Sequence, residues 1–228
     1  MASSQIQVQE LLKNVSLFGE LVPDELDLVA AGAAQVRADS GTVLFRRGEP
    51  CTGFYVIVYG QVKLAFSGAE GAEKVVEILG PGQSFGEPLM FVDQPHVGFA
   101  ETLSDSLLLW IGKAALFAEI DRNPHFARKM LADLAQRLHR MITDIETYSL
   151  MNSTQRVIGY LLRDVAAGAP VPLDIKLPAT KGVVASRLSI TREHFSRVLH
   201  ELCSAGLIEV HGRTVRVMDM DRLRAWEG

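Results

Sequence analysis

The sequence predicts an α+β protein built from an N-terminal antiparallel β-roll, a long amphipathic helix and a C-terminal winged helix-turn-helix. Three observations support this prediction. Short β-rich runs separated by glycines fill residues 41–111, one helical period covers residues 124–148, and two helical patterns followed by two β-rich runs fill residues 180–217. The predicted domains are residues 1–123 for the N-terminal helices and roll, 124–149 for the long helix and 150–228 for the winged unit.

The first domain begins with two short helical patterns, at residues 8–12 and 23–34. The second opens with Pro23-Asp24-Glu25, which puts proline at the first helical position and acidic side chains in the first turn. Glycines then separate the strand-like runs, a rhythm typical of a small antiparallel roll or jelly roll. The predicted strands are residues 42–46, 53–59, 61–66, 74–79 and 107–111.

A stripe of apolar residues marks the long helix. Its members step by three and four, like the a and d positions of a coiled coil, and charged side chains flank them. Part of the stripe can pack on the roll of the same chain, but three continuous heptads favour a parallel homodimer. Residues 149–152 are a predicted hinge before a helix at 155–164, which Asn152 or Ser153 caps. The predicted dimer interface is Leu131, Leu134, Leu138, Met141, Ile145 and Tyr148.

The segment from residue 180 to residue 197 has the pattern of a helix-turn-helix. A first helix at 180–188 leads through Ser189-Ile190 to a second helix with Thr191 as its N-cap. The second helix has one apolar face for a core and one polar face with groups that suit base edges in a DNA major groove. The predicted base-contacting residues are Arg192, Glu193, Ser196 and Arg197.

An ordinary amphipathic helix with a solvated polar face is the alternative interpretation of this segment. The following residues argue against it, because 207–210 and 213–217 form a two-stranded wing around His211-Gly212. Agreement between the helix pair and the wing favours a DNA-binding unit. The residues predicted to contact phosphates are Thr180, Thr191, His211 and Arg213.

The distribution of charge along the chain agrees with a C-terminal unit that binds DNA and an N-terminal domain that does not. The formal net charge is -4, but residues from 151 onward contain eleven Lys and Arg against eight Asp and Glu, or +3, which leaves -7 for residues 1–150. A basic module joined to an acidic domain is typical of a regulator whose first domain does not touch DNA.

The composition also bears on other classes of protein. With 48% apolar and 22% charged residues the chain resembles soluble globular proteins, and its longest apolar runs are too short to cross a bilayer. We expect a cytoplasmic protein without membrane contact. Cys51 and Cys203 lie in different predicted domains, so neither a disulfide framework nor an iron-sulfur cluster is expected. No catalytic triad, metal-ligand spacing or phosphate loop is found, so we do not expect an enzyme.

From about residue 16 to residue 226, the chain resembles the Crp/Fnr superfamily of bacterial transcription regulators. The roll motifs are 41–45 with Gly48-Glu49, and 54–57 with 60–62, while Phe85-Gly86-Glu87 resembles the start of the effector segment. The resemblance implies a roll like that of cyclic-nucleotide-binding domains, a homodimer and RNA polymerase as a partner. Glu193 with Ser196-Arg197 is similar to the Fnr branch and implies a palindrome with TTGAT-like half-sites. Arg192 is more like the Crp branch and leaves the outer base pairs open.

Further motifs resemble the Dnr group within this superfamily. They are Ile145-Glu146-Thr147-x-Ser149-Leu150, Thr154-x-Arg156-Val157, and Leu188-Ser189-Ile190 with Phe195-Ser196-Arg197. This second resemblance implies regulation of denitrification or anaerobic genes in response to nitric oxide, through haem b.

The effector pocket is expected to differ from that of a cyclic-nucleotide receptor. Such a receptor of this fold needs a glutamate for the ribose and an arginine for the cyclic phosphate. Glu87 supplies the first, but no arginine lies between Arg47 and Arg122; Lys63 and Lys74 are the alternative cations. We therefore expect that cyclic AMP is not the effector. The residues placed in the pocket are Phe85, Gly86, Glu87, His96 and Val97.

Haem needs an axial donor, most often histidine. The candidates are His96, His125, His139 and His194, and His96 is the first choice because it lies in the predicted pocket. Two alternatives remain open: a regulator controlled by a cyclic nucleotide, and a roll that acts as a sensor subunit through protein partners.

Overall fold

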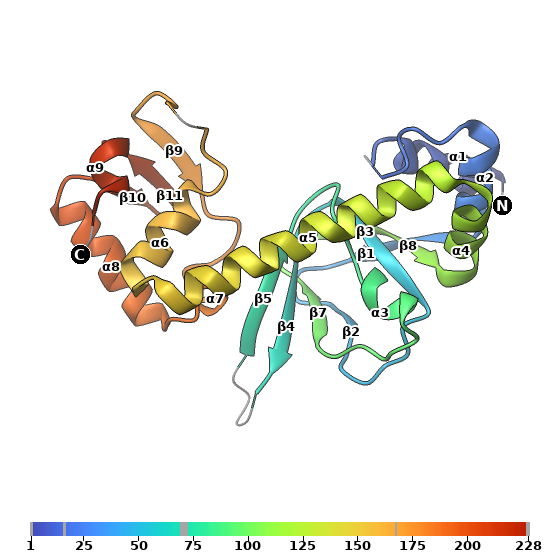
Figure 1. The fold of residues 1–228 in the computed structure, drawn as a ribbon, viewed down its shortest axis with the longest axis horizontal. Helices are drawn as coiled ribbons and strands as arrows, with labels where there is room; N and C mark the ends of the chain where they lie inside the picture. Colours follow the sequence, from blue (N-terminus) through green and yellow to red (C-terminus); the bar gives the residue numbers. More distant parts are fainter. Residues whose placement is uncertain (1, 16, 69–72, 167, 227–228) are drawn as a thin grey trace. The chain divides into compact units, whose positions relative to one another are not determined.

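The computed structural model describes residues 2–15, 17–68, 73–166 and 168–226 (Figure 1). The chain divides into two units. Unit 1 contains Met1–Ala72 and Val76–His139, and unit 2 contains Glu73–Val75 and Arg140–Gly228. The division falls inside the long helix, so the last turns of that helix belong with the C-terminal unit. The predicted boundaries at 123 and 149 stay predictions.

Two antiparallel sheets form the roll, which confirms the fold predicted for the first domain. Among the described residues, one sheet has the strand order β1-β8-β3-β6 and the other β2-β7-β4-β5. The strands are β1 (Ala33–Ala38), β2 (Val43–Phe45), β3 (Gly53–Tyr59), β4 (Val62–Ser67), β5 (Glu73–Leu79), β6 (Ser84–Phe85), β7 (Phe99–Thr102) and β8 (Ser106–Gly112).

Strand β8 explains why residues 107–111 are apolar without alternation. Leu108 packs between the two sheets, in a core that also contains Ile57. Leu109 and Ile111 point to the other side of the strand and pack in a second core under the helices. Because β8 is central and buried on both faces, every position along it favours an apolar residue.

Helices cover the outer face of the sheet that contains β8. They are α1 (Ala2–Lys13), α2 (Pro23–Ala31), α4 (Lys113–Arg122) and the first turns of α5 (Pro124–Leu150). The rings of Phe18 and Phe126 stack with centroids 5.7 Å apart, and both side chains are fully buried. This second core fixes the start of α5 against the roll.

The helix predicted over residues 23–34 is too long. It ends at Ala31, Gly32 is its C-cap, and residues 33–38 form β1, in which Ala33 pairs with Ile111. A Cβ at position 32 would lie 2.3 Å from the Cβ of Ala115, so the chain must pass close to α4 at this point. Strand pairing outweighs the helix propensity of the alanines that follow. The pattern also missed β6, β7, α4 and the short helix α3 (Glu87–Phe91).

The apolar stripe of α5 is largely uncovered within one chain. Leu131, Leu138 and Ile145 are each 60% or more exposed, and Met141 is also exposed. Ile142 is 56% exposed and belongs to the same stripe, although the heptad pattern did not select it. Leu134 is half-buried. Such a stripe favours a partner helix, because an isolated apolar face of this length is costly in water.

Tyr148 differs from the other predicted interface residues. Its side chain is half-buried within unit 2, and its hydroxyl donates to the carbonyl oxygen of Arg187 at 2.6 Å. One of the predicted interface residues therefore already makes a hydrogen bond within its own chain.

Unit 2 has the winged helix-turn-helix that the pattern predicted. Its helices are α6 (Ser153–Leu162), α7 (Lys181–Arg187), α8 (Arg192–Ser204) and α9 (Met220–Arg224). Asn152 caps α6, since its side-chain oxygen accepts from the backbone N–H of Gln155 at 2.9 Å. The described wing has three strands in the order β10-β11-β9, of which β9 (Leu173–Lys176) was not predicted. β10 (Ile208–His211) and β11 (Thr214–Val217) are the predicted pair.

Within the described part of the chain, every helix is too short or too polar to span a bilayer.

Candidate DNA interface and effector site

Helices α7 and α8 are held at a tight turn. Ser189 takes a left-handed conformation with φ of 57°, and the N–H of Ile190 bonds back to the carbonyl oxygen of Ala185 at 3.1 Å. Ala185 is fully buried, which lets the two helices cross closely. The helix that begins at Arg192 is therefore fixed on its apolar side, through Phe195, and free on the other.

All four predicted base-contacting residues lie on the free face of α8. Arg192, Glu193, Ser196 and Arg197 are exposed, whereas Val198 and Leu199 behind them are buried. None of the four side chains makes a hydrogen bond or ion pair with another described residue. Two guanidiniums, one carboxylate and one hydroxyl are thus available to base edges, which is the chemistry of a recognition helix.

The two threonines predicted to contact phosphates also cap helices. The Thr191 hydroxyl accepts from the backbone N–H of His194 at 3.1 Å, and the Thr180 hydroxyl accepts from that of Val183 at 3.5 Å. Each hydroxyl keeps its own hydrogen to donate. Both threonines are exposed, so a cap and a phosphate contact are compatible.

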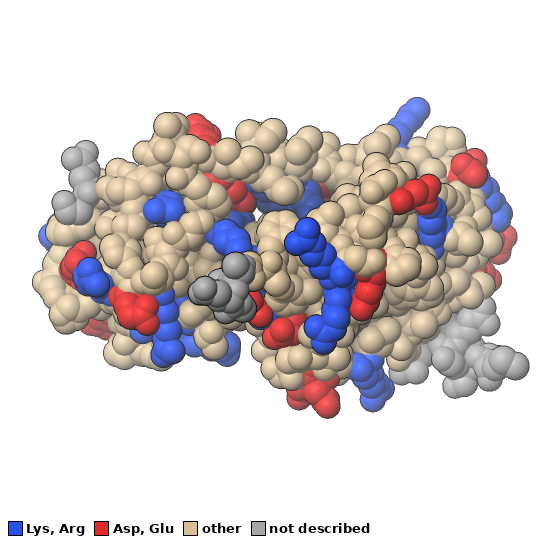
Figure 2. All heavy atoms as spheres, turned by 90° about the horizontal axis from the view of Figure 1, so that it is seen from below, with Lys and Arg blue, Asp and Glu red and all other residues tan. Residues whose placement is uncertain are grey.

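The wing places one arginine and one histidine at the surface. Arg213 and His211 flank Gly212, whose φ of 62° closes the turn, and both side chains are exposed. His211 lies 3.4 Å from Glu209, and Arg216 forms two hydrogen bonds with Asp174 of β9. Arg213 has no such partner among the described residues. On the face drawn in Figure 2, basic and acidic side chains are interspersed. Arg213 is thus an unpaired guanidinium at the tip of the wing, available for a phosphate contact.

His194 has a structural role that the sequence did not reveal. Its Nε2 lies 2.7 Å from the Ser153 hydroxyl, which ties α8 to the first turn of α6. This imidazole belongs to unit 2, so it is not part of the roll in which the effector was expected.

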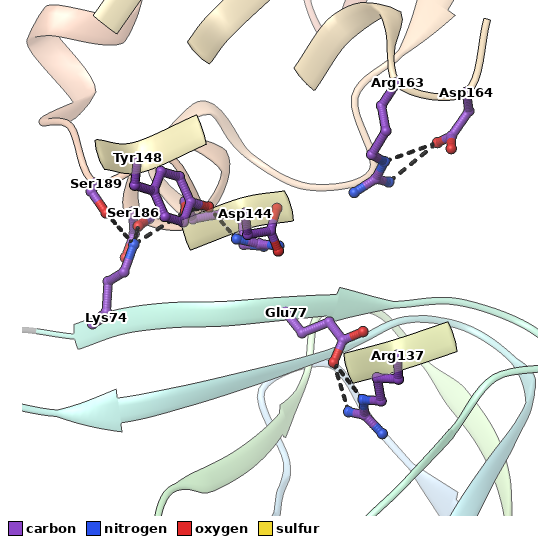
Figure 3. A network of polar contacts seen from close by, with 10 residues as sticks. Lys74, Glu77, Arg137, Asp144, Tyr148, Arg163, Asp164, Ser186 and Ser189 are labelled. Carbon is purple, nitrogen blue, oxygen red and sulfur yellow. Dashed lines mark hydrogen bonds and ion pairs between the residues drawn. The ribbon is translucent and has the colours of Figure 1, made fainter. Parts of the chain in front are cut away.

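Glu87 lies in a buried polar cluster with Arg137 of α5. The Ser84 hydroxyl donates to Glu87 Oε1 at 2.9 Å, and Arg137 Nη1 lies 3.4 Å from the same oxygen. The guanidinium also donates to Glu77 at 2.6 Å (Figure 3). Glu87 Oε2 is buried without a hydrogen-bond partner. Arg137 is the cation that the sequence search missed, because it comes from the helix rather than from the roll.

Of the other predicted pocket residues, His96 is buried and Val97 is exposed. His96 stacks on Phe45 with ring centroids 3.6 Å apart, and Phe45 in turn packs near Phe85. Val97 is 54% exposed, so its side chain is not enclosed in the core of the roll, and its role in an effector pocket stays a prediction. Both residues lie in the loop between α3 and β7, where His96 is buried and Val97 is exposed.

The other candidate histidines and lysines are exposed, are paired with other residues or belong to unit 2. His125 is exposed and bonds Glu20 at 2.8 Å, and His139 is exposed on α5. Lys63 pairs with Glu101 at 3.4 Å, and Lys74 falls in unit 2. The described roll therefore has one buried imidazole, His96, and burial lowers its pKa, which favours the neutral ring.

The titration of Glu87 gives a testable expectation. Burial raises the pKa of Glu87, although Arg137 acts in the opposite direction. A carboxyl whose pKa is raised in the folded state contributes stability at low pH that is lost as the pH rises through that pKa. Glu87→Gln should therefore increase the free energy of unfolding at neutral pH, because the amide does not have to be ionised inside the folded protein. Below the pKa of the unfolded carboxyl, the variant and wild type should be equally stable.

Urea denaturation of the protein at about pH 4 and about pH 8 would check this difference. Glu146→Gln changes an exposed glutamate of α5 and is the matched control. An equal loss of stability at both pH values in Glu87→Gln would show that the hydrogen bond from Ser84 outweighs the cost of burial.

Comparisons with known proteins agree with this geometry. Residues 35–123 match the cyclic nucleotide-binding domain family, and residues 155–226 match the Crp-like helix-turn-helix domain family. The crystal structure of DNR from Pseudomonas aeruginosa is 37% identical, covers 96% of this chain and 97% of that one, and has a TM-score of 0.50.

Two further proteins are similar at lower identity. The CRP-like cAMP-activated global transcriptional regulator of Mycobacterium tuberculosis is 25% identical over 222 residues, or 95% of this chain and 98% of that protein. FixK2 from Bradyrhizobium japonicum is 20% identical with a TM-score of 0.75, covers 86% of this chain and 98% of that one, and shares the fold. Both domain matches and the identity to DNR support one conclusion: the chain belongs to the Crp/Fnr family and is a Crp-like transcription regulator.

Proposed function

We propose that the protein is a homodimeric regulator that binds a palindromic DNA site and is controlled by an effector in its roll. The observation that carries the proposal is the exposed, unpaired set Arg192, Glu193, Ser196 and Arg197 on α8. In the dimer, two such helices would contact successive major grooves, so the half-sites would lie about one helical turn apart. Glu193 with Ser196-Arg197 supports TTGAT-like half-sites, and RNA polymerase would be the protein partner.

The site is tested by fluorescence anisotropy with labelled duplexes. We expect a complex of two protomers on a palindrome of TTGAT-like half-sites, weaker binding to a single half-site, and weaker binding still to a scrambled duplex. Equal affinity for all three duplexes would contradict sequence-specific binding and favour a roll that acts through protein partners.

For the effector, we propose haem with nitric oxide as its ligand. Support comes from the resemblance to the Dnr group and from the 37% identity to DNR. The residues fit one requirement of haem: the imidazole of His96 is buried, burial lowers its pKa, and its Nδ1 has no hydrogen-bond partner among the described residues. Such a nitrogen is a suitable axial donor, while Phe45 covers one face of the ring and orients it. When bound, haem would supply an iron to which nitric oxide can bind.

Haem titration of the purified protein should give a Soret band that shifts on addition of nitric oxide. His96→Ala should change the band, and added imidazole should restore it, whereas His125→Ala, which removes an exposed ring, should behave like wild type. A visible spectrum that stays flat during the titration would exclude haem as the cofactor.

Under the same conditions, calorimetry with cyclic AMP should show no binding, because Arg137 already faces Glu77 and Glu87. Micromolar, stoichiometric binding would restore the cyclic-nucleotide alternative.

A further inference from the structure

A polar cluster within unit 2 joins the end of α5 to the first helix of the helix-turn-helix (Figure 3). Arg187, the last residue of α7, donates through Nη2 to the carboxylate of Asp144 and through Nη1 to the hydroxyl of Tyr148. The Tyr148 hydroxyl donates in turn to the carbonyl oxygen of Arg187 at 2.6 Å. Both the side chain and the backbone of Arg187 are therefore held by α5.

Because Arg187 is buried, the loss of these contacts would be costly. The residue is only 9% exposed, and a buried guanidinium needs a charged or polar partner to compensate for the loss of water. Asp144 and Tyr148 supply that partner from positions four residues apart, which lie on one face of a helix. If α5 were displaced from α7, Arg187 would be left without either partner.

Side chains of α5 and α6 also donate hydrogen bonds to the carbonyl groups at the C-terminal end of α7. The last carbonyls of a helix have no partner within the helix. Here the carbonyl oxygen of Arg187 accepts from Tyr148, and that of Leu188 accepts from Arg156 Nη1 of α6 at 3.0 Å. The turn to α8 follows directly, with Thr191 as the next N-cap. The direction of α8 is thus tied to α5 through the residues that close α7.

We propose that Asp144, Tyr148 and Arg187, here called the helix clamp, are positioning residues that fix the recognition helix relative to the end of α5. In the homodimer, the clamp of each chain would set the separation and angle of the two α8 helices, and therefore the half-site spacing that the dimer accepts. This inference rests on the proposed dimeric DNA recognition. None of the three residues lies on the exposed face of α8, so the clamp selects spacing and not bases.

The test compares wild type with Asp144→Asn and Tyr148→Phe on two sets of duplexes. One set changes the spacing between half-sites by one base pair in each direction; the other changes single base pairs inside a half-site. We expect each variant to lose roughly tenfold in affinity at the preferred spacing and to discriminate less between spacings. Discrimination between half-site bases should stay as in wild type. Because both changes act on Arg187, their combination should lose less than the product of the two effects.

Asp164→Asn is the matched control, since it breaks an exposed ion pair of the same unit, 3.2 Å between Arg163 and Asp164. It should bind every duplex like wild type. Tyr148→Phe keeps the ring, and sedimentation must show that all variants remain dimers with unchanged unfolding transitions. The clamp hypothesis would be overturned if the variants kept the spacing preference of wild type, or if they lost discrimination between bases as much as discrimination between spacings. The proposed function would stand in either case. Wild type that binds no palindrome would overturn the proposed function itself.

Discussion

Leu138→Glu should convert the dimer to a monomer and weaken binding to the palindrome by roughly 10²–10⁴-fold. Leu138 is 60% exposed in one chain and lies between Leu131 and Ile145 on the apolar stripe of α5. A carboxylate in a coiled-coil seam must be desolvated opposite its own copy, which strongly disfavours the dimer. Once the chains separate, each half-site is bound independently, and the advantage of linked binding is lost. Sedimentation velocity and anisotropy on the same samples measure both effects.

Gln136→Glu is the matched control for this substitution. Gln136 is exposed on α5 but lies away from the apolar stripe, so the same charge there should leave both dimer and affinity unchanged. If Leu138→Glu remained dimeric with wild-type affinity, the dimer interface would have to lie elsewhere than on this stripe.

Arg197→Ala should cost roughly 1–3 kcal/mol of DNA binding free energy and relax specificity at one base pair. Its guanidinium is exposed and unpaired on α8, so the loss is that of a base contact and not of an internal ion pair. An arginine in this position can pair bidentately with guanine O6 and N7. Affinities for duplexes substituted singly at each half-site position measure the effect, which should be confined to one of them.

Arg213→Ala serves as the contrasting variant. Arg213 is exposed at the tip of the wing, where a phosphate contact is expected. Its removal should weaken binding to all duplexes alike and lower the slope of log affinity against log salt by about one. A change of base preference in Arg213→Ala, or a uniform loss in Arg197→Ala, would show that the assignment of base and phosphate contacts is reversed.

The helix-turn-helix was predictable because its information is local. Thr180 and Thr191 cap their helices through their own neighbours, and the spacing of Phe195, Val198 and Leu199 alone decides which face of α8 is buried. Helical periodicity and capping chemistry operate within a few residues, so the polar face followed from the sequence.

The sensor cluster was only partly predictable because its members are distant in sequence. Glu87 was found from its motif, but Arg137 enters from a helix fifty residues later. Nothing local to either residue marks the pair. The same holds for His194, whose partner Ser153 lies forty-one residues away. The exposure of Val97, next to the buried His96, is likewise decided by the tertiary structure and not by the local sequence.

By itself, the sequence determined the fold class, the order of the parts, the exposed face of α8 and the apolar stripe of α5, because periodicity, capping and turn chemistry act over short distances. Tertiary structure alone decided that residues 33–38 are a strand, that Arg137 faces Glu87, and that Tyr148 and Asp144 hold Arg187. Each of these depends on which elements meet. A strand gains its hydrogen bonds from a partner far along the chain, and a buried charge is satisfied by whichever opposite charge the packing brings to it.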